Sequence, residues 1–127
     1  MKYIYVGIGG FLGAVGRYLF GELFVLQSGF PIAIVIINLL GSFLLGYLVE
    51  GFRYTTKLSS KVRLGITGGF LGGFTTFSTF SLDFVQLLKQ QDILMAVVFL
   101  LSNIIGGLIC AYLGLKLATY QNKVGAK

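Results

Sequence analysis

The sequence predicts an all-α membrane protein with four transmembrane helices, the third of which is broken. One observation is composition: 56% of the 127 residues are hydrophobic and 11% are charged, whereas a soluble domain carries roughly 25% charged residues. The other is the run GGFLGGFTTFSTFS at 68–81, which lies inside an apolar segment long enough to cross a bilayer. A segment with so many glycine and hydroxyl residues is tolerated inside the bilayer only where protein or water surrounds it. The run therefore predicts an irregular helix beside a polar path.

The chain length fits one small domain, residues 1–127. At about 20 residues per transmembrane helix, this length holds four helices joined by short connections. The first predicted helix contains Arg17 and Glu22 and ends before the polar residues 27–29, and Pro31 suits the first turn of the second. The four spans are expected at 3–26, 31–52, 64–88 and 93–117.

The third and fourth spans differ in regularity. The third follows a polar loop, 53–63, and contains the glycine and hydroxyl run, so we expect its helix to break near 72–76. The fourth follows a turn at 89–92 and is apolar apart from two polar residues near its middle. We expect the polar tail after it, 119–127, to be frayed.

The distribution of cations predicts which side faces the cytoplasm. With four spans, both termini and the 53–63 loop share one side of the membrane, and Lys89 and at most Arg17 lie on the other. The positive-inside rule then makes both termini cytoplasmic. The net charge of +6 therefore fits a membrane protein and predicts no nucleic-acid partner. The cations on the terminal side are Lys2, Arg53, Lys57, Lys61, Arg63, Lys116, Lys123 and Lys127.

Small residues recur four positions apart in every span except the second. Such pairs let another helix approach closely. We therefore expect intimate helix packing, within the chain or between subunits. The pairs are Gly9/Gly13, Gly10/Ala14, Gly68/Gly72, Gly69/Gly73, Gly106/Cys110 and Gly107/Ala111.

The residue types present argue against an enzyme. The chain has no histidine and one cysteine, Cys110, so the usual proton shuttle, the imidazole metal ligand and an intrachain disulfide are all missing. A serine nucleophile would lack a histidine base, and no phosphate-binding fingerprint follows a strand. A proton-exchanging transporter would want a carboxylate deep in a span. Passive permeation is the better fit.

Candidate chemistry centres on Phe77 and Phe80, which lie three residues apart and face one side of a helix. An aromatic ring has a negative face and a positive edge. Ring edges beside the hydroxyls of Thr76 and Ser81 can therefore host a small anion without a full cation that traps it. The alternative is that both phenylalanines are ordinary packing residues.

Polar residues in the other spans have two possible roles. Asn38 carries an amide that is costly to bury without a partner. It either bonds to a neighbouring helix or contributes to a polar track. Asn103, Ser42 and Ser102 present the same alternatives.

The charged residues inside or near the spans also have alternative roles. Arg17 either lines a wet vestibule that attracts anions, or snorkels to the surface, or pairs with Glu22 or Asp83. Glu50 and Asp92 lie at the ends of spans, and we expect them to be solvated.

Three pieces of the sequence carry a resemblance to a known family. They are GGFLGAVGRY at 9–18, NLLGSFLLG at 38–46 and GGFTTFSTFS at 72–81. With these pieces the sequence resembles the fluoride channels known as Fluc or CrcB. The resemblance covers the whole chain in length and span order, and the third piece is highly specific.

The resemblance implies a passive, fluoride-selective channel of the cell membrane that drains toxic fluoride from the cytoplasm. It implies an antiparallel, dual-topology dimer with two pores. The ring edges of Phe77 and Phe80 would point at fluoride, Asn38 would bond the ion, and Arg17 would lie in the vestibule. By position, the polar track would also include Ser78, Thr79 and Asn103.

The resemblance also implies a structural sodium ion at the centre of the dimer. Backbone carbonyls would hold it, those of Gly72 and Thr75, since a hard cation takes oxygen ligands such as a broken helix frees. The charge bias predicts one fixed orientation, whereas an antiparallel homodimer needs insertion both ways. The partner is therefore a second copy or an oppositely oriented homologue.

Two other functions remain open from the sequence. A small four-helix multidrug transporter has a similar length, but Glu22 is too close to the end of its span to couple protons. A non-transporting assembly subunit would use the small-residue faces alone. In the fourth span, Gly107 stands where the family often has serine, which leaves the pore lining there open.

Overall fold

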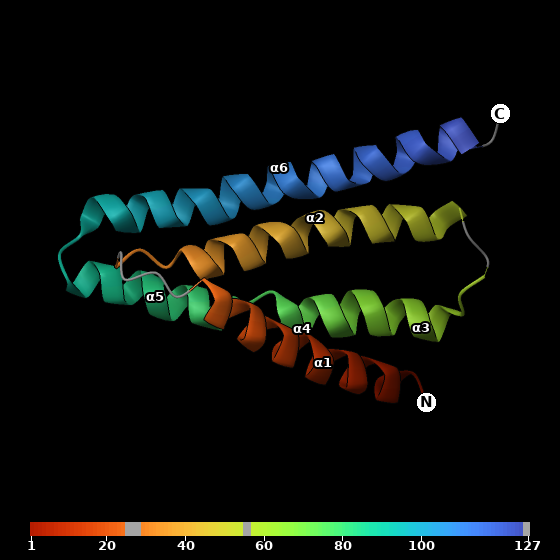
Figure 1. Ribbon diagram of the computed structural model, residues 1–127, viewed down its shortest axis with the longest axis horizontal. Helices are drawn as coiled ribbons and strands as arrows, with labels where there is room; N and C mark the ends of the chain where they lie inside the picture. Colours follow the sequence, from red (N-terminus) through yellow and green to blue (C-terminus); the bar gives the residue numbers. More distant parts are fainter. Residues whose placement is uncertain (25–28, 55–56, 126–127) are drawn as a thin grey trace.

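The computed structural model describes residues 1–24, 29–54 and 57–125, and these residues contain helices and no strand (Figure 1). Residues 27–28 of the predicted polar turn and the cation Lys127 lie outside the described residues. Three of the described helices, α1, α2 and α6, are long and apolar enough to cross a membrane. The elements are α1 (Lys2–Leu23), α2 (Ile32–Tyr54), α3 (Ser60–Leu64), the π-helix η1 (Gly65–Leu71), α4 (Gly72–Phe74), α5 (Ser78–Lys89) and α6 (Ile93–Gly125).

The helices form an elongated bundle with alternating directions. In Figure 1, α2 and α6 lie side by side and run in the same direction, while α3, α4 and α5 follow one another in the opposite direction. α1 crosses this lower row and runs with it. The N-terminus, the end of α2, the start of α3 and the end of α6 therefore all lie at one end of the molecule.

Contacts through glycine hold α2 against α6. A Cβ at Gly46 would clash with the Ala111 carbonyl oxygen, and one at Gly114 would clash with the Phe43 carbonyl oxygen. Backbone thus touches backbone at two successive levels, as small residues in membrane helices allow. The sequence assigned no small-residue pair to the second span, yet Gly46 makes one of these contacts.

The second close contact joins α1 to η1. A Cβ at Gly9 would clash with the Gly65 carbonyl oxygen, and one at Gly13 would clash with that of Phe70. The prediction that Gly9 and Gly13 allow close helix approach is confirmed. A π-helix is rare and tends to occur at functional sites, and here it presents its glycines to α1.

An apolar core fills the opposite end of the bundle from the termini, where α2, α5 and α6 meet. Phe99 of α6 is completely buried, and Phe80 and Phe84 of α5 pack against the core around it. The core anchors α5 on the α2–α6 pair. Its buried members are Val35, Leu87, Ala96 and Phe99.

The prediction of a frayed tail after the fourth span is wrong, because α6 continues to Gly125. The polar side chains of this last part return to the helix or reach α2. Asn122 Nδ2 donates to the Ala118 carbonyl at 2.7 Å, and the Tyr47 hydroxyl donates to Gln121 Oε1 at 2.7 Å. Ala118 is only 1% exposed, so α2 and α6 remain packed together beyond the predicted span.

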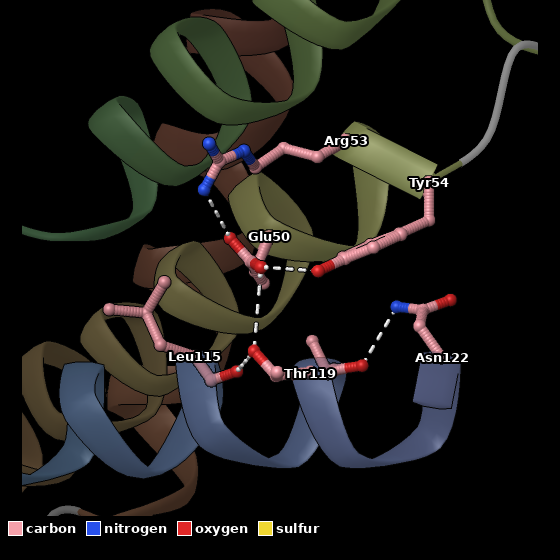
Figure 2. A network of polar contacts seen from close by, with 7 residues as sticks. Glu50, Arg53, Tyr54, Leu115, Thr119 and Asn122 are labelled. Carbon is pink, nitrogen blue, oxygen red and sulfur yellow. Dashed lines mark hydrogen bonds and ion pairs between the residues drawn. The ribbon is translucent and has the colours of Figure 1, made fainter. Parts of the chain in front are cut away.

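The prediction that Glu50 is solvated is also wrong, since its exposed fraction is 8%. Figure 2 shows the carboxylate between α2 and α6, where it accepts hydrogen bonds from Arg53 Nη1 at 3.1 Å and the Tyr54 hydroxyl at 3.2 Å. The Thr119 hydroxyl lies 3.4 Å from Glu50 Oε1 but 3.0 Å from the Leu115 carbonyl. A hydroxyl has one hydrogen, and the shorter bond to Leu115 is the better one.

Candidate functional site

The candidate site begins where helical structure stops at Phe74 and resumes at Ser78. Thr75 is extended, with φ −69° and ψ 156°. Its N–H and its hydroxyl both donate to the Leu71 carbonyl, at 2.9 and 2.8 Å, which closes the last turn of α4. Thr76 Oγ1 then accepts from the Thr79 N–H at 3.1 Å, as a capping side chain does at a helix start.

Side chains from other helices form hydrogen bonds with the backbone of Thr75 and Thr76. Asn38 on α2 accepts from the Thr76 N–H at 2.9 Å and donates to the Thr76 carbonyl at 3.1 Å. Asn38 Nδ2 also donates to Asn103 Oδ1 on α6 at 2.8 Å. From α1, Arg17 Nη1 donates to the Thr75 carbonyl at 3.3 Å. These groups of Thr75 and Thr76, which hydrocarbon could not satisfy, are thus paired within the protein.

A cavity of about 760 Å³ lies beside this segment. Its lining combines polar groups with apolar walls from α5 and α6, and no lining side chain is titratable. Besides Gly72, the polar or aromatic residues that line it are Asn38, Ser42, Thr75, Thr76, Phe77, Phe80, Ser81, Phe84 and Asn103.

Phe77 and Phe80 occupy different environments at the cavity. Their ring centroids lie 5.8 Å apart and the rings are tilted by 38°. Phe80 stacks on Phe99 at 5.2 Å and on Phe84 at 6.2 Å. Phe80 also lines the cavity, and the edges of an aromatic ring are electropositive. Phe77 is 80% exposed, so one side of the cavity is open.

Several backbone groups at this segment have no hydrogen-bond partner among the described residues. The N–H groups of Phe77, Ser78 and Phe80 donate to no protein acceptor, and the carbonyl of Gly72 accepts from no donor beyond α4. Free N–H groups at the start of a helix favour an anion. Free carbonyl oxygens favour a cation.

The structure brings most of the predicted site residues together. Asn38, Asn103, Phe77 and Phe80 line the cavity, as do the residues of the two predicted sodium-binding carbonyls, Gly72 and Thr75.

The other predicted residues lie next to the cavity and do not line it. Ser78 and Thr79 are within 3.3 and 3.1 Å of the Thr76 hydroxyl. Arg17 joins the site through the Thr75 carbonyl, and among the described residues it forms no ion pair with Glu22 or Asp83.

Thr76 has a larger role in the site than its place in the sequence indicates. It is 7% exposed, and its N–H, carbonyl and hydroxyl are all hydrogen-bonded. The signal available in the sequence was its place in the FTTF segment, which is shared by its neighbour Thr75.

Comparison with known proteins identifies the family. Residues 4–115 match the family model described as "CrcB-like protein, Camphor Resistance (CrcB)". The fluoride-specific ion channel FluC 1 of Moorella thermoacetica is 41% identical over 120 residues, 93% of this chain and 86% of that protein. The fluoride-specific ion channel FluC of Prosthecochloris aestuarii is 42% identical over 89% of each chain. The fluoride-specific ion channel FluC 2 of Listeria innocua is 36% identical over 99% of this chain and 97% of that protein. This chain belongs to the CrcB family.

Proposed function

We propose that this chain is a subunit of a fluoride-selective passive channel that lets fluoride leave the cytoplasm and so relieves fluoride toxicity. The chain is a multi-pass protein of the cell membrane, and its relatives bear the name fluoride-specific ion channel. The observation that carries the proposal is the cavity of about 760 Å³, where aromatic edges and neutral polar groups meet with no titratable side chain.

The lining of the cavity supports passive conduction of a small anion. Permeation needs binding strong enough to replace the ion's hydration and weak enough to release it. Ring edges, hydroxyls and amides carry partial charges, so they meet both needs, whereas a lysine or arginine in the path would trap the ion.

The residues of the proposed track are those nearest the non-helical segment. They are the ring edges of Phe77 and Phe80, the hydroxyls of Ser78 and Thr79, and the amide of Asn103, with Asn38 behind them. Asn103 Nδ2 uses one of its two hydrogens for the Phe99 carbonyl, at 2.9 Å, and the other is available to an ion. Arg17 is the candidate cation of the vestibule.

The third membrane crossing is proposed to be the whole stretch 60–89, broken at Thr75–Phe77. A second subunit, antiparallel to the first, would cover the open side of the cavity, where Phe77 is 80% exposed and backbone N–H groups lack partners. Lipid cannot satisfy such groups, and protein can. The partner is a second copy or an oppositely oriented homologue.

A structural sodium ion between the two subunits is part of the proposal. The donor chemistry fits, because the carbonyls of Gly72 and Thr75 belong to residues beside the same cavity and a hard cation takes oxygen ligands. Among the described residues, Gly72 O has no backbone partner, while Thr75 O accepts from Arg17. A carbonyl has two lone pairs, so Thr75 O can serve both. Two carbonyls are too few for a complete shell, and a second subunit would supply the rest.

The proposal is tested by fluoride efflux from liposomes that contain the purified protein, with a fluoride electrode as detector. We expect fluoride to leave down its gradient, at a rate independent of any imposed proton gradient, while chloride is retained. Protein-free liposomes are the control. Proton-driven uptake of a hydrophobic cation without fluoride efflux would instead favour the multidrug transporter.

A further inference from the structure

The end of the bundle that holds both termini carries an excess of positive charge (Figure 1). The sequence has four acidic residues, and only Glu50 belongs to this end. Figure 2 shows Glu50 between α2 and α6, where it is 8% exposed and accepts a hydrogen bond from Arg53. The exposed surface of this end therefore presents cations and no other acidic side chain. Its exposed lysines include Lys2, Lys61, Lys116 and Lys123.

Helix α6 is longer than a membrane crossing requires. Its 33 residues extend about 50 Å, whereas the hydrocarbon core is about 30 Å thick and takes about 20 residues. Because α6 begins at Ile93, directly after the polar turn 89–92, about 20 residues bring it to the opposite boundary at Tyr112. Lys116 is the first charged residue of the helix, which agrees with this boundary. The rest of α6, to Gly125, lies among and beyond the lipid headgroups.

Two tyrosines and two lysines share one face of this part of α6. Tyr112, Lys116 and Tyr120 follow one another at intervals of four residues, and Lys123 comes seven residues after Lys116, so the four lie along one side of the helix. Tyr112 is 54% exposed and Tyr120 is 68% exposed. Gly114, whose backbone contacts α2, lies about 200° around the helix from Lys116. This tyrosine–lysine face therefore points away from α2.

The ring of Tyr112 holds the ammonium group of Lys116 near the boundary. Lys116 Nζ lies 4.9 Å from the centroid of the Tyr112 ring, which is within the range of a cation–π interaction. Tyrosine has an apolar body and a polar tip, and it is enriched where hydrocarbon meets headgroups. An ammonium group has three N–H donors, so Lys116 can contact the ring and still donate to phosphate oxygens.

We propose that the tyrosine–lysine face of α6 binds the headgroups of anionic phospholipids, whose phosphates accept hydrogen bonds from Lys116 and Lys123. The positive-inside rule places this end in the cytoplasm, and anionic lipids give the cytoplasmic leaflet a negative surface potential that attracts such cations. A soluble acidic partner fits less well, because Tyr112 and Lys116 lie at the edge of the hydrocarbon, where lipid surrounds the helix. Lipid binding here does not depend on which ion the chain conducts.

The test is native mass spectrometry of the purified protein, with phosphatidylglycerol or phosphatidylcholine of the same acyl chains as the added lipid. We expect the wild-type protein to bind phosphatidylglycerol more tightly. In the double variant Lys116→Gln/Lys123→Gln, the affinity for phosphatidylglycerol should fall by roughly tenfold or more, because each cation near the headgroups contributes. The affinity for phosphatidylcholine should not change. Lys116→Arg/Lys123→Arg keeps both charges and should keep the wild-type preference.

The matched control is Lys2→Gln/Lys61→Gln. It removes two cations from the same end of the molecule, but from α1 and α3, and it should lower the affinity for phosphatidylglycerol by less than about threefold. An equal loss in this control would reject the proposal, because the total charge of the end would then be what binds the lipid. Equal affinity of the wild-type protein for the two lipids would also reject it.

A second measurement keeps both lysines, in case the double glutamine variant does not fold. The chain has no tryptophan, so Tyr112→Trp provides a single fluorophore at the expected hydrocarbon boundary and keeps an aromatic ring beneath Lys116. The vesicles contain equal amounts of the two lipids, and one lipid at a time carries bromine on its acyl chains. We expect brominated phosphatidylglycerol to quench the tryptophan more strongly than brominated phosphatidylcholine. Equal quenching by the two lipids would overturn the proposal.

Discussion

The contact between α2 and α6 at Gly46 provides a sharp test of the fold. In Gly46→Ala, the new Cβ would clash with the Ala111 carbonyl oxygen, so the two helices must move apart. Gly51→Ala is the matched control on the same helix, because a Cβ there meets no atom within 4 Å. Both substitutions replace glycine by alanine in a helix and gain up to about 1 kcal/mol in propensity. Their difference therefore isolates the helix contact.

The expected size of that difference follows from the structure. Overpacking a close contact costs about 1–3 kcal/mol. Separating the helices also stretches the 2.8 Å bond between Asn38 and Asn103, and loss of a hydrogen bond costs about 1 kcal/mol more. We expect Gly46→Ala to be less stable than Gly51→Ala by about 2–4 kcal/mol.

Unfolding of the two variants in bicelles by steric trapping measures this difference directly. Fluoride efflux should fall in Gly46→Ala and stay at the wild-type level in Gly51→Ala. If Gly46→Ala proves as stable as Gly51→Ala, backbone contact between α2 and α6 at this level is refuted.

Three further predictions concern the site and the end of α6. Replacing Phe77 and Phe80 together by isoleucine should abolish fluoride efflux from liposomes while size-exclusion chromatography still gives the wild-type assembly, and unchanged efflux would reject the ring-edge mechanism. Arg17→Gln removes a positive charge about 5 Å from the proposed sodium ion. At an effective dielectric constant near 20, loss of this repulsion should raise sodium affinity by roughly tenfold or more. The sodium dependence of thermal stability measures the affinity, and an equal or weaker affinity in the variant would contradict the prediction. Thr119→Val should change the free energy of unfolding by less than about 1 kcal/mol, because the single hydroxyl hydrogen is donated to the Leu115 carbonyl of the same helix. A larger loss of stability would show that the hydroxyl instead donates to Glu50 of α2.

The sequence pattern placed the start of each span where apolar composition changes abruptly. α1, α2 and α6 begin at Lys2, Ile32 and Ile93, against predicted starts of 3, 31 and 93. It failed at the end of α6, where polarity suggested fraying. There, Thr119 and Asn122 bond to carbonyls of their own helix, and this side-chain pairing is invisible to a hydropathy pattern.

The site was predictable as far as residue types in one segment allowed. Phe77 and Phe80 stand in a run of hydroxyl residues, and that local composition pointed to the cavity they line. The partner of Asn38 was not predictable, because Thr76 lies 38 residues away and any buried polar group could have satisfied the amide. The burial of Glu50 was not predictable either. Its hydrogen-bond partners Arg53 and Tyr54 are close in sequence and suggest a solvated helix end, whereas the helix that covers it, α6, is distant in sequence.

The central claim is that fluoride crosses the membrane through the cavity beside Thr75–Phe77, driven only by its own electrochemical gradient. The most direct measurement is the reversal potential of the current through the purified protein in a planar bilayer, with unequal fluoride and equal chloride and pH on the two sides. We predict a reversal potential equal to the Nernst potential of fluoride. A current that reverses at the potential of chloride or protons, or no current at all, would contradict the claim.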